Sequence, residues 1–254
     1  IAIDKDETYA YFTCHDRHVI KRLDLTTLAV TNFIGLDGTS GNVNGFGASV
    51  RFRNPAILLF SPSYNYLIVT DASNNLIKTI RISDLYVSVL IGTGTATNVD
   101  NFNALSTTLT NPKSLAFSED FTKLYFSTVY CLVADSGNHA IRKVDIVSGY
   151  MSTLAGSGTA GYNDAVGVLA QFNKPVDVTL DWTESYAYVS DYNNNCIRRI
   201  DLTTAAADWT TPTPTLSVLA GDGTNGLVDN VNGAAAKFYN PTGVAVDFAG
   251  QSLL

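Results

Sequence analysis

The chain has 254 residues, of which 46% are hydrophobic and 15% are charged, and its formal net charge is −7. The low charge content excludes a coiled coil or a charged disordered tail, and the acidic balance argues against nucleic-acid binding, which usually needs a basic footprint. The sequence also lacks an apolar run of the roughly 20 residues that a transmembrane helix requires. Because it begins with Ile1 inside a strand-like segment, we expect it to be a piece of a longer protein.

Four similar segments recur along the chain and define its organisation. They are CHDRHVIKRLDL from Cys14, DASNNLIKTIRI from Asp71, DSGNHAIRKVDI from Asp135 and DYNNNCIRRIDL from Asp191. A proline preceded by Asn or Lys lies between neighbouring segments and again after the last one. The spacing of the segments and prolines gives a base period of 57 residues. The repeats cover approximately 1–54, 55–111, 112–174 and 175–240, followed by a partial repeat over 241–254. We expect residues 1–13 and 242–254 to be the same portion of a repeat.

Each repeat is predicted to contain four short strands. In the fourth repeat these are VDVTLDW from Val176, SYAYVSD ending at Asp191, CIRRIDL from Cys196 and TLSVLAG from Thr215. Turn-forming Asp, Asn, Thr and Gly separate the strands, and no helical periodicity is present. The sequence therefore predicts an all-β fold, a segment of a β-propeller with four-stranded antiparallel blades. A solenoid of 57-residue turns is the alternative.

The strand after each proline alternates small or polar residues with bulky ones. Because successive strand residues point to opposite faces, Ser114, Asp177 and Gly243 are predicted to face a central channel. Leu115 and Val178 are predicted to face the core, and a one-residue slip would exchange the two faces.

Three linked motifs give the repeat a family resemblance. VADSGNHAIRKV at 133–144, NPKSLAF at 111–117 and LAGSGTAGYND at 154–164 resemble the NHL-repeat β-propellers, and related motifs cover the whole chain. The resemblance implies a propeller of typically about six blades. Four repeats and a partial one would then be completed by further blades or by another chain.

Glycine-rich linkers join the repeats. Gly156-x-Gly158-x-x-Gly161 matches a dinucleotide fingerprint, but a strand follows it where the cofactor would need a helix N-terminus. No cofactor is therefore predicted. One acidic or amide residue recurs in these linkers, at Asn44, Asp100, Asp164 and Asp229. Hydrogen bonds that close the loop are the favoured explanation, with calcium ligation as the alternative.

Half of the sixteen Lys and Arg residues lie in the third strand of the repeats. They are Lys21, Arg22, Lys78, Arg81, Arg142, Lys143, Arg198 and Arg199. We favour pairing between blades with the aspartates of the same repeats, and the alternative is a basic ring for an acidic partner. The histidines, His15, His18 and His139, occupy turns of different repeats. They predict neither a zinc site nor a catalytic constellation, so no catalytic residue and no metal are predicted.

Two repeats carry extra residues. Seven lie between Leu124 and Asp135 and predict a bulge or a protruding loop, an irregular feature that exposes Tyr130 or Cys131. The cysteines are expected to be small buried side chains, and a disulfide from Cys131 to Cys196 is the alternative. The second insertion is the loop 203–215 at the outer rim. Its Thr/Pro-rich sequence predicts a partner- or glycan-bearing site at Trp209, Thr211, Thr213 and Thr215; alternatively, Trp209 caps the blade edge.

We interpret the sequence as a non-catalytic interaction or structural module, a scaffold within a larger extracellular or cell-surface glycoprotein. Its partners would be other proteins or further blades, together with an O-linked glycan, and nucleic acid would not be among them. A catalytic propeller of the lyase or hydrolase type, with its site outside this segment, is the first alternative. A nucleic-acid adaptor is the second.

Overall fold

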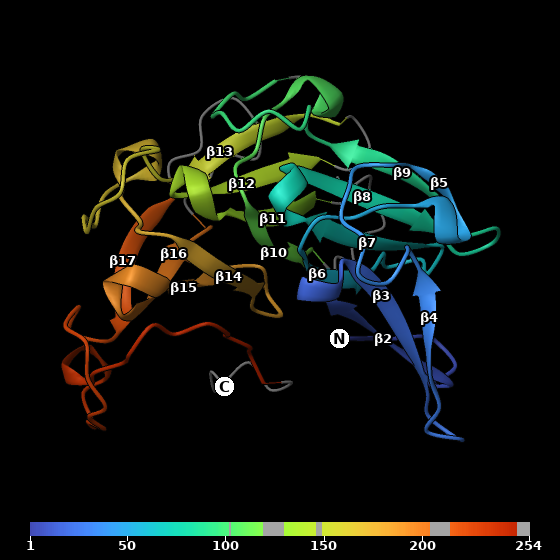
Figure 1. Ribbon diagram of the computed structural model, residues 1–254. Helices are drawn as coiled ribbons and strands as arrows, with labels where there is room; N and C mark the ends of the chain where they lie inside the picture. The colour runs from blue at the N-terminus through green and yellow to red at the C-terminus, as the bar shows by residue number, and fades with distance from the viewer. Residues whose placement is uncertain (102, 119–129, 146–148, 204–213, 248–254) are drawn as a thin grey trace. The chain divides into compact units, whose positions relative to one another are not determined.

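The computed structural model describes residues 1–101, 103–118, 130–145, 149–203 and 214–247 (Figure 1). These residues form antiparallel β-sheets joined by turns and short 3₁₀ segments, and no α-helix occurs among them. None of their helices is long and apolar enough to cross a membrane. The fold is all-β, and each of the four full repeats forms a four-stranded propeller blade. The chain divides into two compact units, 1–99 with 103–113 and 100–102 with 114–254.

The first unit contains two blades. The first blade has the strand order β1 (Ala2–Ile3), β2 (Tyr9–Cys14), β3 (Val19–Asp24) and β4 (Val30–Ile34). The second blade consists of β6 (Pro55–Phe60), β7 (Tyr66–Asp71), β8 (Leu76–Arg81) and β9 (Tyr86–Ile91). A two-residue strand of the linker between the blades, β5 (Gly45–Phe46), pairs with the outer edge of β9 (Figure 1). The linker is thus fastened to the blade that it leads into.

The third and fourth blades follow the same plan. The third contains β10 (Pro112–Phe117), β11 (Tyr130–Asp135), β12 (Ala140–Asp145) and β13 (Met151–Ala155). The fourth contains β14 (Pro175–Leu180), β15 (Tyr186–Asp191), β16 (Cys196–Asp201) and β17 (Thr215–Ala220). One 3₁₀ turn joins the second and third strands of each blade, at His15–Arg17, Ala72–Asn74, Ser136–Asn138 and Tyr192–Asn194. Another lies in each linker, at Gly47–Ser49, Ala104–Ser106, Gly167–Leu169 and Gly233–Ala235.

Apolar side chains fill the space between the two blades of each unit. In the first unit Phe52 of the linker is fully buried with Ile20 of β3 and Leu58 of β6. In the second unit Phe172 occupies the equivalent position, among residues that include Val178 of β14. Burying one such aromatic ring stabilises the fold by roughly 1.5–3 kcal/mol. The linkers are therefore part of the core.

A glycine with left-handed backbone follows the outer strand and begins the linker. Gly156 has φ +109°, and a Cβ there would lie 2.5 Å from the His139 carbonyl oxygen. Gly92 and Gly221 have the same conformation, at φ +103° and +96°. The turn passes so close to the backbone of the same blade that a side chain does not fit.

Ser114, Asp177 and Gly243 lie close together, as the predicted register requires, whereas their exposure to a central channel stays a prediction. Ser114 Oγ lies 2.5 Å from Asp177 Oδ1, and a Cβ at Gly243 would lie 3.9 Å from Asp177 Oδ2. Leu115 and Val178 are both buried on the opposite face. The alternation of small polar and bulky residues therefore grouped Ser114 with Asp177 correctly, and both faces of β10 are buried, since Ser114 is 1% exposed.

The second strand of the third blade differs from expectation. β11 is a regular ladder with β12 from Tyr130 to Asp135, so the predicted irregularity is wrong for these residues. The extra residues precede the strand, and 119–129 lie outside the described part of the chain. Cys131 is 1% exposed and Tyr130 is half-buried. Cys131 and Cys196 are free thiols, so the disulfide between them is not formed.

The partial repeat and the chain start also need a correction. Ala2 pairs with Tyr11 as Thr179 pairs with Tyr188. Residue 1 is therefore equivalent to residue 178 of the fourth repeat. Because Pro175 and Pro241 are equivalent, residue 178 is in turn equivalent to residue 244. The sequence comparison had aligned residue 1 with residue 242, two residues earlier. Of residues 241–247, only Val246 forms an isolated bridge, and no strand is present there.

Candidate functional site

One buried polar cluster recurs at the end of the second strand in the second, third and fourth blades. Its carboxylates belong to Asp71, Asp135 and Asp191, and each pairs with a buried cation seven residues later. The pairs are Lys78 Nζ to Asp71 Oδ2 at 2.8 Å, Arg142 Nε to Asp135 Oδ2 at 2.9 Å, and Arg198 Nη1 to Asp191 Oδ2 at 2.9 Å. A fully buried carboxylate is tolerated only when it is paired and hydrogen-bonded in this way.

Local geometry explains the seven-residue spacing. Asp191 ends β15, the turn Tyr192–Asn194 reverses the chain, and β16 returns antiparallel beside it. Asn194 Nδ2 donates to Asp191 Oδ2 at 2.8 Å, and the backbone N–H of Asn173 donates to Asp191 Oδ1 at 2.7 Å. The Asp191 carboxylate therefore stabilises both the turn that follows it and the end of the linker just before Pro175.

Burial and ion pairing shift the pKa of the Asp191 carboxyl in opposite directions. Burial raises the pKa of Asp191, while hydrogen bonds from Asn173 and Asn194 and the charge of Arg198 lower it, and the net direction is upward. The cluster is thus a desolvated charge that depends on its partners, which is typical of a structural ion pair.

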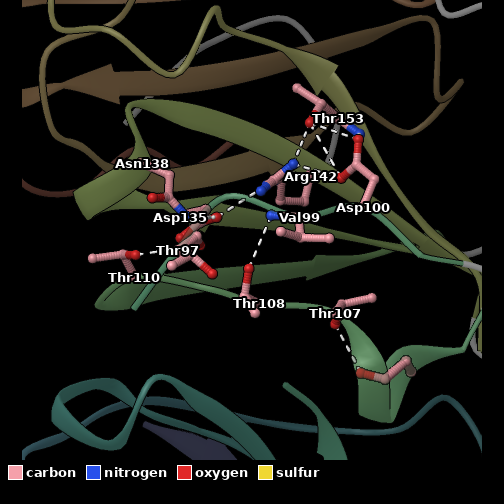
Figure 2. A network of polar contacts seen from close by, with 11 residues as sticks. Thr97, Val99, Asp100, Thr107, Thr108, Thr110, Asp135, Asn138, Arg142 and Thr153 are labelled. Carbon is pink, nitrogen blue, oxygen red and sulfur yellow. Dashed lines mark hydrogen bonds and ion pairs between the residues drawn. The ribbon is translucent and has the colours of Figure 1, made fainter. Parts of the chain in front are cut away.

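A linker carboxylate completes the cluster in the third blade (Figure 2). Asp100 Oδ1 accepts from Arg142 Nη1 at 2.5 Å, and Asp100 Oδ2 accepts from the backbone N–H of Thr153 at 2.9 Å. The Thr153 hydroxyl contacts both Arg142 and Asp100. One arginine therefore joins the incoming linker, the second strand and the outer strand.

The fourth blade repeats this arrangement. Asp164 pairs with Arg198, and Asp164 Oδ2 accepts from the backbone N–H of Val218 in β17 at 3.2 Å. Asp100 and Asp164 thus hydrogen-bond to strands of the blade that follows instead of closing their own loops, which corrects the expectation for these two positions. The expected pairing of cations is also found, but it joins each linker to the blade that follows, because the linker crosses that blade before entering it. In the second blade the pair is Lys78 and Asp71, and Lys78 also donates to the Arg51 carbonyl at 3.1 Å.

A second repeated contact joins each blade to the end of the linker that leaves it. The residue directly after the 3₁₀ turn accepts a hydrogen bond from the backbone N–H of the residue before the next proline. The pairs are His18 with Asn54, Asn75 with Asn111, His139 with Lys174 and Asn195 with Asn240, at 2.9–3.1 Å. The two histidines accept through Nδ1, so they serve as substitutes for asparagine. The recurrence of His or Asn at one repeat position was the signal for this role, and sequence reasoning missed it.

The inner strands of the second unit meet at Asp177. Its Oδ1 accepts from Ser114, and its Oδ2 accepts from the backbone N–H of Val244 at 2.9 Å. Burial raises the pKa of Asp177, and these hydrogen bonds partly oppose the shift. Both carboxylate oxygens therefore hold inner-strand segments together.

The outward cations of the third strands stack on tyrosines of the second strands. Arg22 Cζ lies 4.3 Å from the Tyr9 ring centroid, and Lys143 Nζ lies 4.4 Å from that of Tyr130. Tyr130 also contacts Glu184 through its hydroxyl at 3.4 Å, and burial raises its pKa. The predicted contact residue Tyr130 is thus engaged within its own unit.

The other predicted contact residues lie mostly beyond the described ranges. Trp209, Thr211 and Thr213 fall in 204–213, which the structure does not describe. Thr215 begins β17, is exposed, and forms a bridge with Val166 of the preceding linker. Thr215 is therefore the one of these four residues that the structure places, and its bridge joins it to Val166.

No family model matches the chain. It is 29% identical to human NHL repeat-containing protein 2 over 114 residues, 45% of this chain and 15% of that protein. It is 23% identical to the Arabidopsis thaliana protein SUPPRESSOR OF QUENCHING 1, chloroplastic, over 99% of this chain and 23% of that protein. The chain therefore spans less than a quarter of either curated relative. The solved structure of a streptogramin B lyase aligns with 98% of this chain and 59% of its own at a TM-score of 0.56 and 15% identity, which shows a shared fold.

Proposed function

The chain belongs to the NHL-repeat β-propellers, and from that premise we propose that it is a non-catalytic interaction or structural module of a larger extracellular or cell-surface protein. The observation that carries this proposal is that the repeated charged groups bind other groups within the fold. Asp135, Arg142 and Asp100 bind one another and the backbone around them. Because these charged groups are occupied in internal ion pairs, they make the blades rigid. Recognition of a partner is then left to the loops at the rim.

The contact site of this module is the loop 203–215. It joins β16 to β17, the two outermost strands of the fourth blade, and its sequence TTAAADWTTPTPT has two prolines that remove backbone donors. Trp209 supplies the aromatic anchor that interfaces favour. Thr211 and Thr213 lie in the Thr/Pro-rich tract that carries O-linked glycan in the secreted protein.

Fluorescence quenching and mass spectrometry test this assignment on the full chain. Trp182→Phe leaves Trp209 as the single indole, and we expect acrylamide to quench it readily. The peptide containing Thr211, Thr213 and Thr215 is expected to carry added hexosamine mass after secretion from eukaryotic cells. A photo-crosslinker at position 209 should then join the chain to protein partners. A shielded Trp209 together with an unmodified peptide would reject this site.

A catalytic propeller is the alternative, since a lyase shares the fold. Stoichiometric metal in the purified chain, with turnover lost on its removal, would favour the catalytic alternative. Salt-dependent binding of RNA would favour an adaptor for nucleic acid. Binding of a protein partner that Trp209→Ala abolishes would favour the proposed module.

A further inference from the structure

Four exposed side chains form a row across the second blade. Tyr66 of β7 is the register partner of Arg81 of β8, and Phe46 of β5 is the register partner of Tyr86 of β9. Arg81 and Tyr86 also lie side by side, since Arg81 Cζ is 5.6 Å from the Tyr86 ring centroid. Register partners share one face of a sheet, and all four side chains are exposed. The strands β7, β8, β9 and β5 therefore display Tyr, Arg, Tyr and Phe in succession (Figure 1).

The arginine of this row is particular to the second blade. In the other three blades an aspartate occupies the position of Arg81, and a cation two residues earlier stacks on the tyrosine of the second strand. The aspartates are Asp24, Asp145 and Asp201, and the cations are Arg22, Lys143 and Arg199. In the second blade Thr79 occupies the position of those cations. The contacts that the repeat uses elsewhere therefore do not explain Arg81.

Hydrogen bonds leave the row with donors to offer. Asp84 Oδ1 accepts from Arg81 Nε at 2.8 Å and from the backbone N–H of Tyr86 at 3.1 Å. Asp84 Oδ2 accepts from Arg81 Nη2 at 2.7 Å. A guanidinium has five N–H donors, and in the part of the chain that the structure describes the other three have no hydrogen-bond acceptor. Because the ion pair cancels the charge of the row, the complementary ligand is uncharged and supplies acceptors.

The spacing of the rings indicates the shape of such a ligand. One strand separates β7 from β9, so the Cα atoms of Tyr66 and Tyr86 lie about 9.6 Å apart at a strand spacing of about 4.8 Å. A polyproline II helix rises about 3.1 Å per residue, which places residues i and i+3 about 9.3 Å apart on one side. Its carbonyls have no internal partner, and its prolines have no N–H. A sugar fits less well, because its hydroxyls must also donate and the Asp84 oxygens are occupied.

We propose that the row of Tyr66, Arg81, Tyr86 and Phe46 binds a proline-rich segment of a partner protein, which crosses the strands as a polyproline II helix. One proline packs on Tyr66, and the proline three residues away packs on Tyr86 and Phe46, whose ring centroids are 4.9 Å apart. The Arg81 guanidinium between them donates to a backbone carbonyl of the segment. Aromatic surfaces recognise such segments because the polyproline II helix is already formed before binding. The inference rests on the proposed function as an interaction module, and it adds a second contact surface to the loop 203–215.

Fluorescence anisotropy of a labelled peptide tests the row on the full chain. The probe consists of four copies of Pro-Ala-Thr, which has prolines at i and i+3. Its matched control consists of three copies of Pro-Ala-Thr-Thr, which has the same length but prolines at i and i+4. We expect the probe to bind saturably and roughly tenfold more tightly than the control peptide.

Substitutions in the row should weaken the binding of the probe. Tyr66→Ala and Tyr86→Ala should each do so by roughly tenfold, and Arg81→Met should do so by roughly fivefold. Tyr239→Ala is the matched control, because it removes an exposed tyrosine of the linker 221–240, and it should leave the binding unchanged.

Fluorine NMR of the chain labelled with 3-fluorotyrosine gives a second measurement that does not depend on the alanine variants folding. Tyr66→Phe and Tyr86→Phe assign the two resonances, which should shift when the probe is added, whereas that of Tyr239 should not. No saturable binding, equal binding of the two peptides, or unshifted Tyr66 and Tyr86 resonances overturns the proposal. Binding of an acidic peptide or a soluble oligosaccharide in place of the probe, abolished by Tyr86→Ala, would overturn it in favour of that ligand class. The Trp209 measurements do not involve this row, so the proposed function and this inference can fail separately.

Discussion

Replacing Arg142 by methionine should be among the most destabilising changes in the chain. Arg142 and Asp135 are both fully buried, and their Nε and Oδ2 atoms lie 2.9 Å apart. Methionine keeps much of the side-chain volume but leaves the Asp135 carboxylate desolvated without its cation. Breaking one partner of a buried pair costs about 3–5 kcal/mol, a large share of the 5–15 kcal/mol typical of a folded domain. Asp100 is 40% exposed, so Asp100→Asn should cost only about 0.5–1 kcal/mol.

The matched variant is Arg142→Lys, because Lys78 already occupies this position in the second blade and reaches Asp71 at 2.8 Å. We expect it to cost about 1–2 kcal/mol, since the bond to Asp100 is lost and the charge at Asp135 is kept. Adding Asp135→Asn to Arg142→Met should recover part of the loss by removing the orphaned charge. Denaturant unfolding combined with amide exchange of β12 measures these values, because two compact units need not unfold in one step. A loss below about 1 kcal/mol for Arg142→Met would refute the reasoning.

Three further outcomes are expected. Burial lowers the pKa of His139 below its usual 6.5, so the unfolded chain binds more protons than the folded chain, and stability falls as the pH drops through about 6.5. His139→Asn should flatten this pH dependence of stability in thermal melts recorded at several pH values. An unchanged slope would contradict the prediction. Gly156→Ala should cost at least about 3 kcal/mol by denaturant unfolding because its Cβ meets backbone, whereas Gly47→Ala, with open space around it, should cost about 1 kcal/mol; equal losses would disprove the steric argument. Burial raises the pKa of both Cys131 and Cys196 to about 12, so iodoacetamide should leave both unmodified in the folded chain, and labelling of either by peptide mass would argue against its burial.

The sequence contained enough information for the blades and for the inner-strand faces. Strand alternation is a local property with a period of two, so Ser114 and Asp177 could be assigned to one face and Val178 to the other. The position of the extra residues in the third blade was harder to assign. The apolar run before Asp135 resembles one long strand, and only the ladder with β12 shows that the strand begins at Tyr130.

The pairing of the charges could not be predicted, because it depends on where a linker passes in space. Asp100 and Arg142 are 42 residues apart, and the sequence offered several acids for each cation. Their contact arises because the linker crosses the third blade and Asn101 bridges to Met151. Strand periodicity carries no information about that crossing. The same limit hid the bond from Lys174 N–H to His139, which joins two blades through a residue that looked like an isolated turn histidine.

The linkers make the stability of this fold depend on neighbouring repeats. The second, third and fourth blades each have a buried carboxylate and cation that their own strands only partly satisfy, and the linker from the preceding repeat supplies further partners. The third and fourth blades use arginine, whose planar group reaches Asp135 and Asp100 together, whereas the second blade uses Lys78, a point charge beside one carboxylate. In a repeat protein such contacts act between nearest neighbours. In the second, third and fourth blades, the buried ion pair therefore has all of its partners only when the incoming linker lies on the blade.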